Sequence, residues 1–221
     1  MGEEIKVKHI ESVDAESLLT QDLADAIDHG IIVSNLAKLV AGELGYDEVI
    51  CQKISVAGML HDIGKLKLSK YLYGRRENSL AIEEIKYIRM HAALGYEILN
   101  ERGYDPFVLD AVYYHHENYD GSGYPDNLCG DQIPLGARII RTCDVFAALV
   151  SVRPYRAAFD IETAIELMID EVKNFDMKIF LAFQRVVHSE EFEDIREFVK
   201  LCNETSNYCV FLEDFVGEFD T

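Results

Sequence analysis

One stretch of the chain, residues 115–125, gathers side chains that bind metal ions or phosphate groups. It reads HHENYDGSGYP and contains two adjacent histidines, two carboxylates, two glycines and a tyrosine–proline pair. Adjacent imidazoles are uncommon in a purely structural helix, because both rings titrate and both need partners. The glycines permit positive φ and the proline fixes φ, as a tight loop requires. Taken alone, the pattern is equally compatible with a solvated polar loop.

A wider set of polar residues falls on otherwise apolar helix faces or at helix ends. It consists of His29, His61, Asp62, His91, His115, His116 and Asp144, and it includes five of the seven histidines. A single histidine on a helix is more often a satisfied core or surface residue than a ligand. A buried carboxylate at Asp144 would need a partner, because an uncompensated buried charge is costly. If the helices form a bundle, one shared cluster satisfies all of these side chains together.

The chemistry of such a cluster is that of a metal centre. Mixed histidine and carboxylate ligands suit transition metals such as iron, manganese, zinc or nickel. Seven ligands are too many for one metal that keeps an open position, so they predict two metal ions with Asp62 placed to bridge them. Two metals about 3.5–4 Å apart are a standard arrangement for in-line displacement at phosphorus. Because the metals lower the pKa of bound water, a hydroxide held between them attacks phosphorus at neutral pH.

The spacing of apolar residues predicts that helices position these side chains, in an all-α chain without alternating strands. The predicted helices run from Thr20, as N-cap, to Gly45; from Asp47, as N-cap, to His61–Lys65; from Ser79 through His91; from Asp105-Pro106 into His115-His116; from Pro134 through Leu149; from Asp160 to about Lys173; from Met177 to Val187; and over residues 189–203. Residues 66–78 are predicted to form a loop rich in cations, and residues 207–216 a strand or hairpin.

Composition narrows the class of protein. A chain of 221 residues that is 49% hydrophobic can bury a sizeable single core. The net charge of −19 argues against binding a DNA or RNA polymer, whereas a small anion can still bind where clustered cations reverse the potential. Five scattered cysteines and an N-terminus without an apolar region predict a cytoplasmic protein with reduced thiols. No apolar run is long enough to cross a bilayer, so we expect no membrane partner.

These motifs resemble those of a known family. The pair His61-Asp62 is the dipeptide that names the HD superfamily of metal-dependent phosphohydrolases, and HHE followed by DGxGYP resembles the signature of its HD-GYP branch. The similarity continues through residues 61–65, 91–95, 133–139 and 153–156, and it covers about residues 20–187. The resemblance implies an HD-type helical bundle over residues 20–187, with an N-terminal lead-in (1–19) and a short acidic C-terminal extension (188–221).

The resemblance also implies roles for individual residues. The family's metal ligands fall on His29, His61, Asp62, His91, His115, His116 and Asp144, and the carboxylate that supplies a third metal in some members falls on Asp25. Two or three divalent ions, most often iron or manganese, are therefore implied. Lys65 matches the lysine that contacts the scissile phosphate, so Asp62 and Lys65 are the expected catalytic residues. The positions that contact the nucleotide fall on Tyr124, Arg153 and Arg156.

The implied activity is hydrolysis of cyclic di-GMP to linear pGpG and, in a further step, to GMP. Two alternatives stay open: a phosphodiesterase for another cyclic dinucleotide such as cyclic GMP-AMP, and a non-catalytic cyclic-dinucleotide receptor or interaction module. The sequence departs from the family at Asp25, where trinuclear members have glutamate, at Ala147, where an aspartate is usual, and in the loop after Lys65. The acidic segment 189–221 fits a homodimer or signalling-partner surface, although a solvated covering helix is the simpler interpretation.

Overall fold

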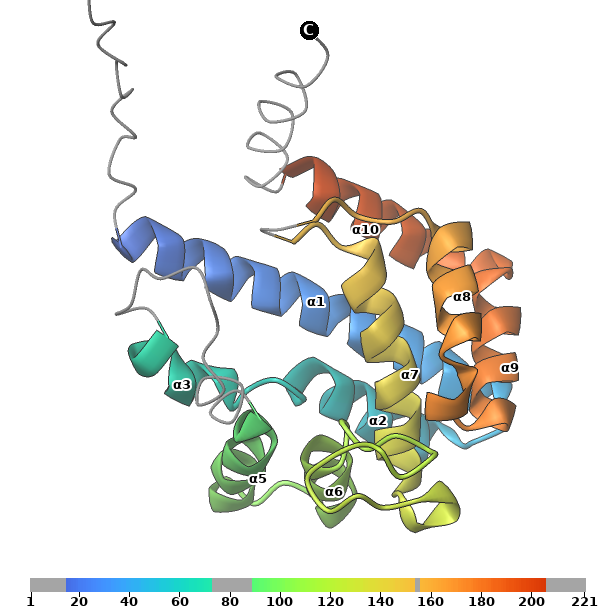
Figure 1. Cartoon of the computed structure of the whole chain (residues 1–221), viewed down its shortest axis with the longest axis horizontal. Coiled ribbons are helices and arrows are strands. Elements are labelled where there is room, and N and C mark those ends of the chain that lie inside the picture. Colours follow the sequence, from blue (N-terminus) through green and yellow to red (C-terminus); the bar gives the residue numbers. More distant parts are fainter. Residues whose placement is uncertain (1–14, 73–88, 154–155, 206–221) are drawn as a thin grey trace, which may run out of the picture.

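The fold is all-α, as the periodicity of the sequence predicts. The structure is a computed structural model, and it describes residues 15–72, 89–153 and 156–205 (Figure 1). Within these ranges the only β-type pairing is an isolated bridge between Arg153 and Arg156. None of the described helices is long and apolar enough to span a bilayer.

Nine α-helices and three short 3-10 segments make up the described part of the chain. They are α1 (Ala15–Glu43), α2 (Glu48–Leu60), α3 (Lys65–Leu72), α5 (His91–Glu101), α6 (Pro106–Tyr113), η1 (Gly130–Gln132), α7 (Leu135–Val150), α8 (Ile161–Asp170), η2 (Val172–Asn174), α9 (Met177–Val187), η3 (Glu190–Phe192) and α10 (Glu193–Thr205).

Local capping explains where several helices begin. Asp47 accepts a hydrogen bond from the amide of Ile50, and Asp160 accepts one from the amide of Thr163. Asp105 accepts one from the amide of Phe107, and a proline occupies the first turn of α6, where a missing N–H costs nothing. These starts agree with the expectations from sequence, as does the span of α9.

Several predicted boundaries are wrong. Helix α8 ends at Asp170 rather than near Lys173, and α10 begins at Glu193, after a short 3-10 segment, rather than at residue 189. Helix α1 begins at Ala15, so Thr20 lies inside the helix and is not its N-cap. Helix α3 occupies the first part of the predicted loop 66–78, because the run from Lys65 to Leu68 consists of good helix formers and Leu68 is buried. The helix predicted to start at Ser79 and the strand predicted at residues 207–216 fall largely outside the described residues.

Helix α1 runs through the middle of the bundle and packs against α2, α7, α9 and α10 (Figure 1). The core lies where these helices meet, with Leu36 of α1, Ile54 of α2, Phe146 of α7 and Phe183 of α9 fully buried. Gly58 allows α2 to approach α1 closely, since a Cβ there would lie 3.0 Å from the Cα of Ser34. This packing fixes the relative positions of α1, α2 and α7, which provide the chemically important side chains.

The segment that follows α9 is part of the same core. Phe192 is fully buried, Ile195 and Val199 of α10 are buried, and α10 packs against α1. The acidic residues of the first turn of α10, Glu193 and Asp194, are exposed. Over residues 189–205 the segment therefore behaves as the covering helix that the sequence favours.

Candidate metal centre

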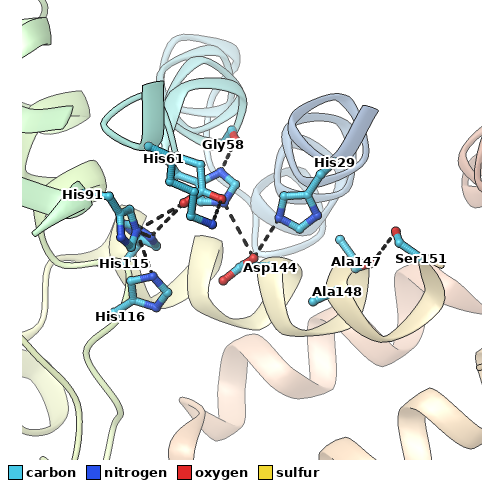
Figure 2. A network of polar contacts seen from close by, with 12 residues as sticks. His29, Gly58, His61, His91, His115, His116, Asp144, Ala147, Ala148 and Ser151 are labelled. Carbon is cyan, nitrogen blue, oxygen red and sulfur yellow. Dashed lines mark hydrogen bonds and ion pairs between the residues drawn. The ribbon is translucent and has the colours of Figure 1, made fainter. Parts of the chain in front are cut away.

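The seven predicted metal ligands converge at the centre of the bundle, although they come from five separate parts of the chain (Figure 2). His29 lies on α1, His61 caps the end of α2, Asp62 follows it, and His91 is the first residue of α5. His115 and His116 follow α6, and Asp144 lies on α7. Their donor atoms form two groups, in each of which all atoms lie within 4.8 Å of one another: His29, His61 and Asp144 in the first, and Asp62, His91, His115 and His116 in the second.

The two groups are joined through the His61-Asp62 pair. The Nε2 atom of His61 lies 3.6 Å from Oδ1 of Asp144 and 3.4 Å from Oδ2 of Asp62. On one side, Nε2 of His29 lies 2.9 Å from Oδ1 of Asp144. On the other, Oδ1 of Asp62 lies 3.2 Å from Nε2 of His91. The arrangement is therefore one continuous cluster with Asp62 at its middle, where a bridging ligand would be.

The tautomers of the histidines indicate that the cluster is built for cations. Nδ1 of His61 lies 2.7 Å from the carbonyl oxygen of Gly58, and Nδ1 of His115 lies 2.6 Å from that of Val112. A carbonyl oxygen only accepts, so each Nδ1 carries a proton, and each ring presents the lone pair of Nε2 to the cluster when Nε2 is unprotonated.

The ring nitrogens that face the cluster crowd together. Nε2 of His91 lies 3.2 Å from Nε2 of His115 and 3.0 Å from Nε2 of His116. The buried Nε2 of His61 and Oδ1 of Asp62 make no well-aligned hydrogen bond with the described residues. Two nitrogen lone pairs at such separations repel unless a proton or a metal cation lies between them. The donor set therefore fits bound divalent metal ions of the kind that nitrogen and oxygen ligands prefer.

The electrostatic environment keeps the ligands in suitable protonation states. Burial, with the neighbouring imidazoles, holds the pKa of His115 well below its ordinary value, and burial lowers the pKa of His116 to about 3. Burial opposes ionisation of Asp62 and Asp144, but several neighbours together outweigh it. His61 and Lys65 at Asp62, and His29 and His61 at Asp144, keep the pKa of both carboxyls well below the usual range. Burial also opposes protonation of His61, yet the two carboxylates raise its pKa to about 10. A proton on His61 thus balances the carboxylates until a metal ion replaces it.

Two glycines allow α3 and α5 to bring Asp62 beside His91. A Cβ on Gly64 would overlap the carbonyl oxygen of His91 and lie 2.7 Å from the amide nitrogen of Gly95. A Cβ on Gly95 would lie 3.1 Å from the side chain of Val112, in the helix that leads to His115. Glycine at both positions is therefore a condition for the close packing of the ligands.

The loop after His116 folds back over that ring. The amide of Tyr124 donates to the carbonyl of His116 at 3.2 Å, and the two rings stack with centroids 4.6 Å apart. Gly123 is required for this return, because a Cβ there would overlap the backbone of Glu117 and lie 2.5 Å from the carbonyl oxygen of His116. Glu117 is buried, and its Oε1 accepts the amide of Asp126 at 2.7 Å. Within the HHE motif, the glutamate thus holds the loop and lies in neither ligand group.

The predicted substrate-binding residues differ in where they lie. Lys65 borders the cluster, with Nζ 2.5 Å from Oδ2 of Asp62, and its side chain is 48% exposed. Tyr124 also borders the cluster through its stacking on His116. Arg153 lines a small cavity beside His29, together with Asp25. Asp25, the predicted ligand of a third metal, lies in neither ligand group.

Arg156 has a different environment. Its guanidinium donates to the carbonyl oxygens of Ala148, Leu149 and Ala157 and lies 4.4 Å from the ring centroid of Phe159. These contacts cap the last turn of α7, so the guanidinium donors of Arg156 already bind carbonyl oxygens of the protein. The assignment of Arg156 to the substrate remains a prediction.

Sequence reasoning missed Arg141, which lies next to the cluster. Its Nε donates to Oδ1 of Asn118 at 2.9 Å. Burial is the main cause of the low pKa of His116, and the positive charge of Arg141 lowers that pKa further. Burial also raises the pKa of Tyr124, and the charge of Arg141 opposes that rise. One signal was available: Arg141 precedes Asp144 by three residues, and that spacing places both on one face of a helix.

Comparison with known proteins agrees with this geometry. A model of the HD domain family matches residues 13–179. The cyclic di-GMP phosphodiesterase response regulator RpfG of Xanthomonas campestris is 40% identical over 136 residues, which are 60% of this chain and 35% of that protein. The 3′3′-cGAMP-specific phosphodiesterase 3 of Vibrio cholerae is 33% identical over 177 residues, which are 80% of this chain and 37% of that protein.

Among solved structures, an HDG"Y"P protein of Bdellovibrio bacteriovorus, Bd1817, superimposes with a TM-score of 0.62 at 19% identity, covering 79% of this chain and 57% of that one. That similarity concerns the fold. The chain belongs to the HD domain family, and the resemblance to its HD-GYP branch is confirmed. It spans little more than a third of the length of the two curated relatives it matches.

Proposed function

We propose that this chain is a metal-dependent phosphodiesterase that hydrolyses cyclic di-GMP to linear pGpG and then to GMP. The main support is the buried cluster of seven ligands with Lys65 at its edge. Relatives named as cyclic di-GMP and 3′3′-cGAMP phosphodiesterases support the substrate class.

The metal complement that we propose is two divalent ions, iron or manganese, one for each ligand group. His29, His61 and Asp144 would hold one, and His91, His115 and His116 the other, with Asp62 shared. A third ion would require Asp25, which lies outside both groups. Bound ions of this kind lower the pKa of a coordinated water and act as Lewis acids toward a phosphoryl oxygen.

The side chains have separate tasks in this proposal. Lys65 faces the scissile phosphate and stabilises the negative charge that develops on its oxygens. Tyr124 offers an aromatic face beside His116 against which a guanine base can stack. Arg153 binds the nucleotide just beyond the C-terminal end of α7, at the cavity beside His29. Cations at these points oppose the net charge of −19, which would otherwise repel a dianionic substrate.

The decisive experiment combines metal analysis with a substrate panel. Protein purified without oxygen is analysed for bound metals and then incubated with cyclic di-GMP, cyclic GMP-AMP and cyclic di-AMP. The same measurements on Asp62→Ala provide the comparison. Turnover by the wild type, together with lower metal content and no turnover in the variant, supports the proposal. Absence of turnover of every cyclic dinucleotide, with unchanged metal content in Asp62→Ala, overturns it.

A second candidate substrate is cyclic GMP-AMP. It is favoured by the similarity to the Vibrio cholerae 3′3′-cGAMP-specific enzyme over 80% of this chain. The same panel separates the two, since the preferred substrate is the one with the higher kcat/KM.

A non-catalytic receptor is the alternative from another class of protein. The observation that favours a receptor is Ala147. This residue is fully buried one turn after Asp144 and provides no carboxylate there. Binding of a dinucleotide without hydrolysis by metal-loaded protein would favour the receptor.

The cellular location and the oligomeric state of the protein are also proposals. The four cysteines within the described residues are free, which is compatible with a cytoplasmic location. A homodimer or a signalling partner would use surface outside the cluster, and light scattering of the purified chain tests the dimer.

A further inference from the structure

Arg141 has no carboxylate partner among the described residues, unlike one other arginine on α7, one on α9 and one on α10. Arg138 pairs with Asp131 and Asp176, both at 2.7 Å. Arg185 pairs with Glu43, and Arg196 with Glu193. Arg141 is half-buried, yet among the described residues it forms no ion pair, and its one hydrogen bond is from Nε to Asn118. A guanidinium that is partly removed from water without an anion is costly, so it needs another explanation.

The hydrogen bond to Asn118 also sets the orientation of this side chain. Asn118 uses its oxygen to accept from Nε, while its Nδ2 donates to Oγ of Ser122 at 3.0 Å. The amide is therefore fixed from both sides, and the guanidinium is fixed with it. The two terminal nitrogens of Arg141 have no hydrogen-bond partner in the described parts of the chain. They form the planar pair of donors that matches two oxygens of a phosphate.

The position of Arg141 complements that of Lys65. Within the second ligand group, Nε2 of His91 lies 3.2 Å from Oδ1 of Asp62 and 3.0 Å from Nε2 of His116. Lys65 contacts the Asp62 end of this row. Arg141 lies at the His116 end, since Asn118 is two residues beyond His116. A second guanidinium, that of Arg89, lies 5.0 Å from the ring centroid of Tyr124. The ligand group thus has a cation at each end.

We propose that Arg141 is a substrate-binding residue that holds a phosphate group of the cyclic dinucleotide, on the side of the cluster opposite to Lys65. This inference rests on the proposed function. A cyclic dinucleotide has two phosphates; Lys65 faces the one that is cleaved, and Arg141 binds the other. The second phosphate of the substrate then pairs with the guanidinium of Arg141, for which no described side chain provides an anion. Arg141 in this way selects for a substrate with two phosphates over a simple phosphodiester.

The test compares two substrates in the full chain loaded with metal. The variants are Arg141→Gln and Arg141→Lys. Arg102→Gln is the matched control, because Arg102 is exposed and its guanidinium contacts the carbonyl of Ile98 alone among the described residues. For cyclic di-GMP, Arg141→Gln is expected to raise KM about tenfold or more, with kcat changed less than about threefold. For bis(p-nitrophenyl) phosphate, which has one phosphate, both constants should stay within about twofold of the wild type. Arg141→Lys should raise the KM for cyclic di-GMP less than Arg141→Gln does, but still above that of the wild type. The ammonium keeps the positive charge but lacks the planar pair of donors.

The contrary result has a distinct signature. If Arg141 only held the loop through Asn118, Arg141→Gln and Asn118→Ala would lower turnover of both substrates equally and reduce metal content. An equal effect on the two substrates, or an unchanged KM for every cyclic dinucleotide that the wild type hydrolyses, overturns the inference and leaves the proposed function intact. If the wild type cleaves bis(p-nitrophenyl) phosphate but neither binds nor cleaves any cyclic dinucleotide, the proposed function fails, and this inference fails with it.

Discussion

The carbonyl oxygen of His91 lies against the backbone of Gly64 so closely that no Cβ fits between them. Gly64 is the last residue of the turn that leads into α3, two residues after Asp62, and His91 begins α5. This contact therefore sets the separation of two ligands, and Oδ1 of Asp62 lies 3.2 Å from Nε2 of His91 as a result. The metal centre depends on backbone packing as much as on the ligands themselves.

Gly64→Ala is accordingly expected to damage both stability and metal binding. The added methyl must push α5 away from α3, at a cost of about 1–3 kcal/mol in the free energy of unfolding. The shift separates His91 from Asp62, so metal content should fall as well. Gly42→Ala is the matched control, because none of the described residues would lie within 4 Å of a Cβ there and an alanine favours the helix. Urea unfolding and elemental analysis of both variants provide the measurement, and equal stability of the two variants would contradict the argument.

Asp62→Asn should have the largest effect on metal content among single-ligand changes. Asp62 is the residue through which the two ligand groups meet, so its loss weakens both metals rather than one. We expect turnover of bis(p-nitrophenyl) phosphate to fall about a hundredfold or more, because both metals contribute to the reaction. Asp110→Asn, an exposed position on α6, is the control. The expectation is wrong if Asp62→Asn retains the metal content of the wild type.

Much of this architecture could be predicted from sequence, for identifiable physical reasons. Helix capping is local, so Asp47 and Asp160 could be recognised directly. Apolar periodicity identified which polar side chains face inward, and the structure brings the donor atoms of seven such residues together. That these atoms bind metal stays a prediction.

The features that were missed depend on distant contacts. Arg141 gains its significance from Asn118, 23 residues earlier in the chain. The guanidinium of Arg156 is occupied by carbonyls at the end of α7, which no motif reveals. The cation-rich run after Lys65 is predicted to be a loop, but leucine and lysine also favour helices, and α3 forms there.

Lys65→Met should lower kcat and leave the metals in place. Nζ of Lys65 pairs with Asp62 at 2.5 Å, and metal ions held by Asp62 would free the ammonium for the substrate. Because the lysine stabilises charge that develops in the transition state, a loss of about 10²–10³ in kcat is expected. Lys67→Met, two residues further on and exposed, should have little effect. Steady-state kinetics with cyclic di-GMP, together with elemental analysis, distinguish this outcome from simple loss of metal.

Arg156→Ala should act mainly on stability. Its guanidinium donates to three carbonyl oxygens and stacks on Phe159, so the variant leaves the end of α7 without its cap. Loss of charged hydrogen bonds of this kind costs about 1.5–3 kcal/mol. Arg153→Ala is the comparison, and it should raise KM with little change in the unfolding midpoint. If Arg156→Ala instead raises KM at unchanged stability, the side chain serves the substrate as the family resemblance implies.

The stability of the metal-free protein should depend on pH through His61. The folded protein raises the pKa of this ring from 6.5 to about 10, because Asp62 and Asp144 favour the protonated form against the opposing effect of burial. Because the pKa of the ring is higher in the folded protein than in the unfolded one, protonation of His61 stabilises the fold. This stabilisation is complete at pH values below the unfolded-state pKa, and it is lost as the pH rises from that pKa to the folded-state pKa. Chelated protein should therefore lose thermal stability between about pH 6 and about pH 8, below the range in which its thiols ionise. Metal-loaded protein should lose less, because the cation replaces the proton. Thermal unfolding with and without chelator measures the effect, and chelated His61→Gln is the control; an equal decline in that variant would assign the effect to other groups.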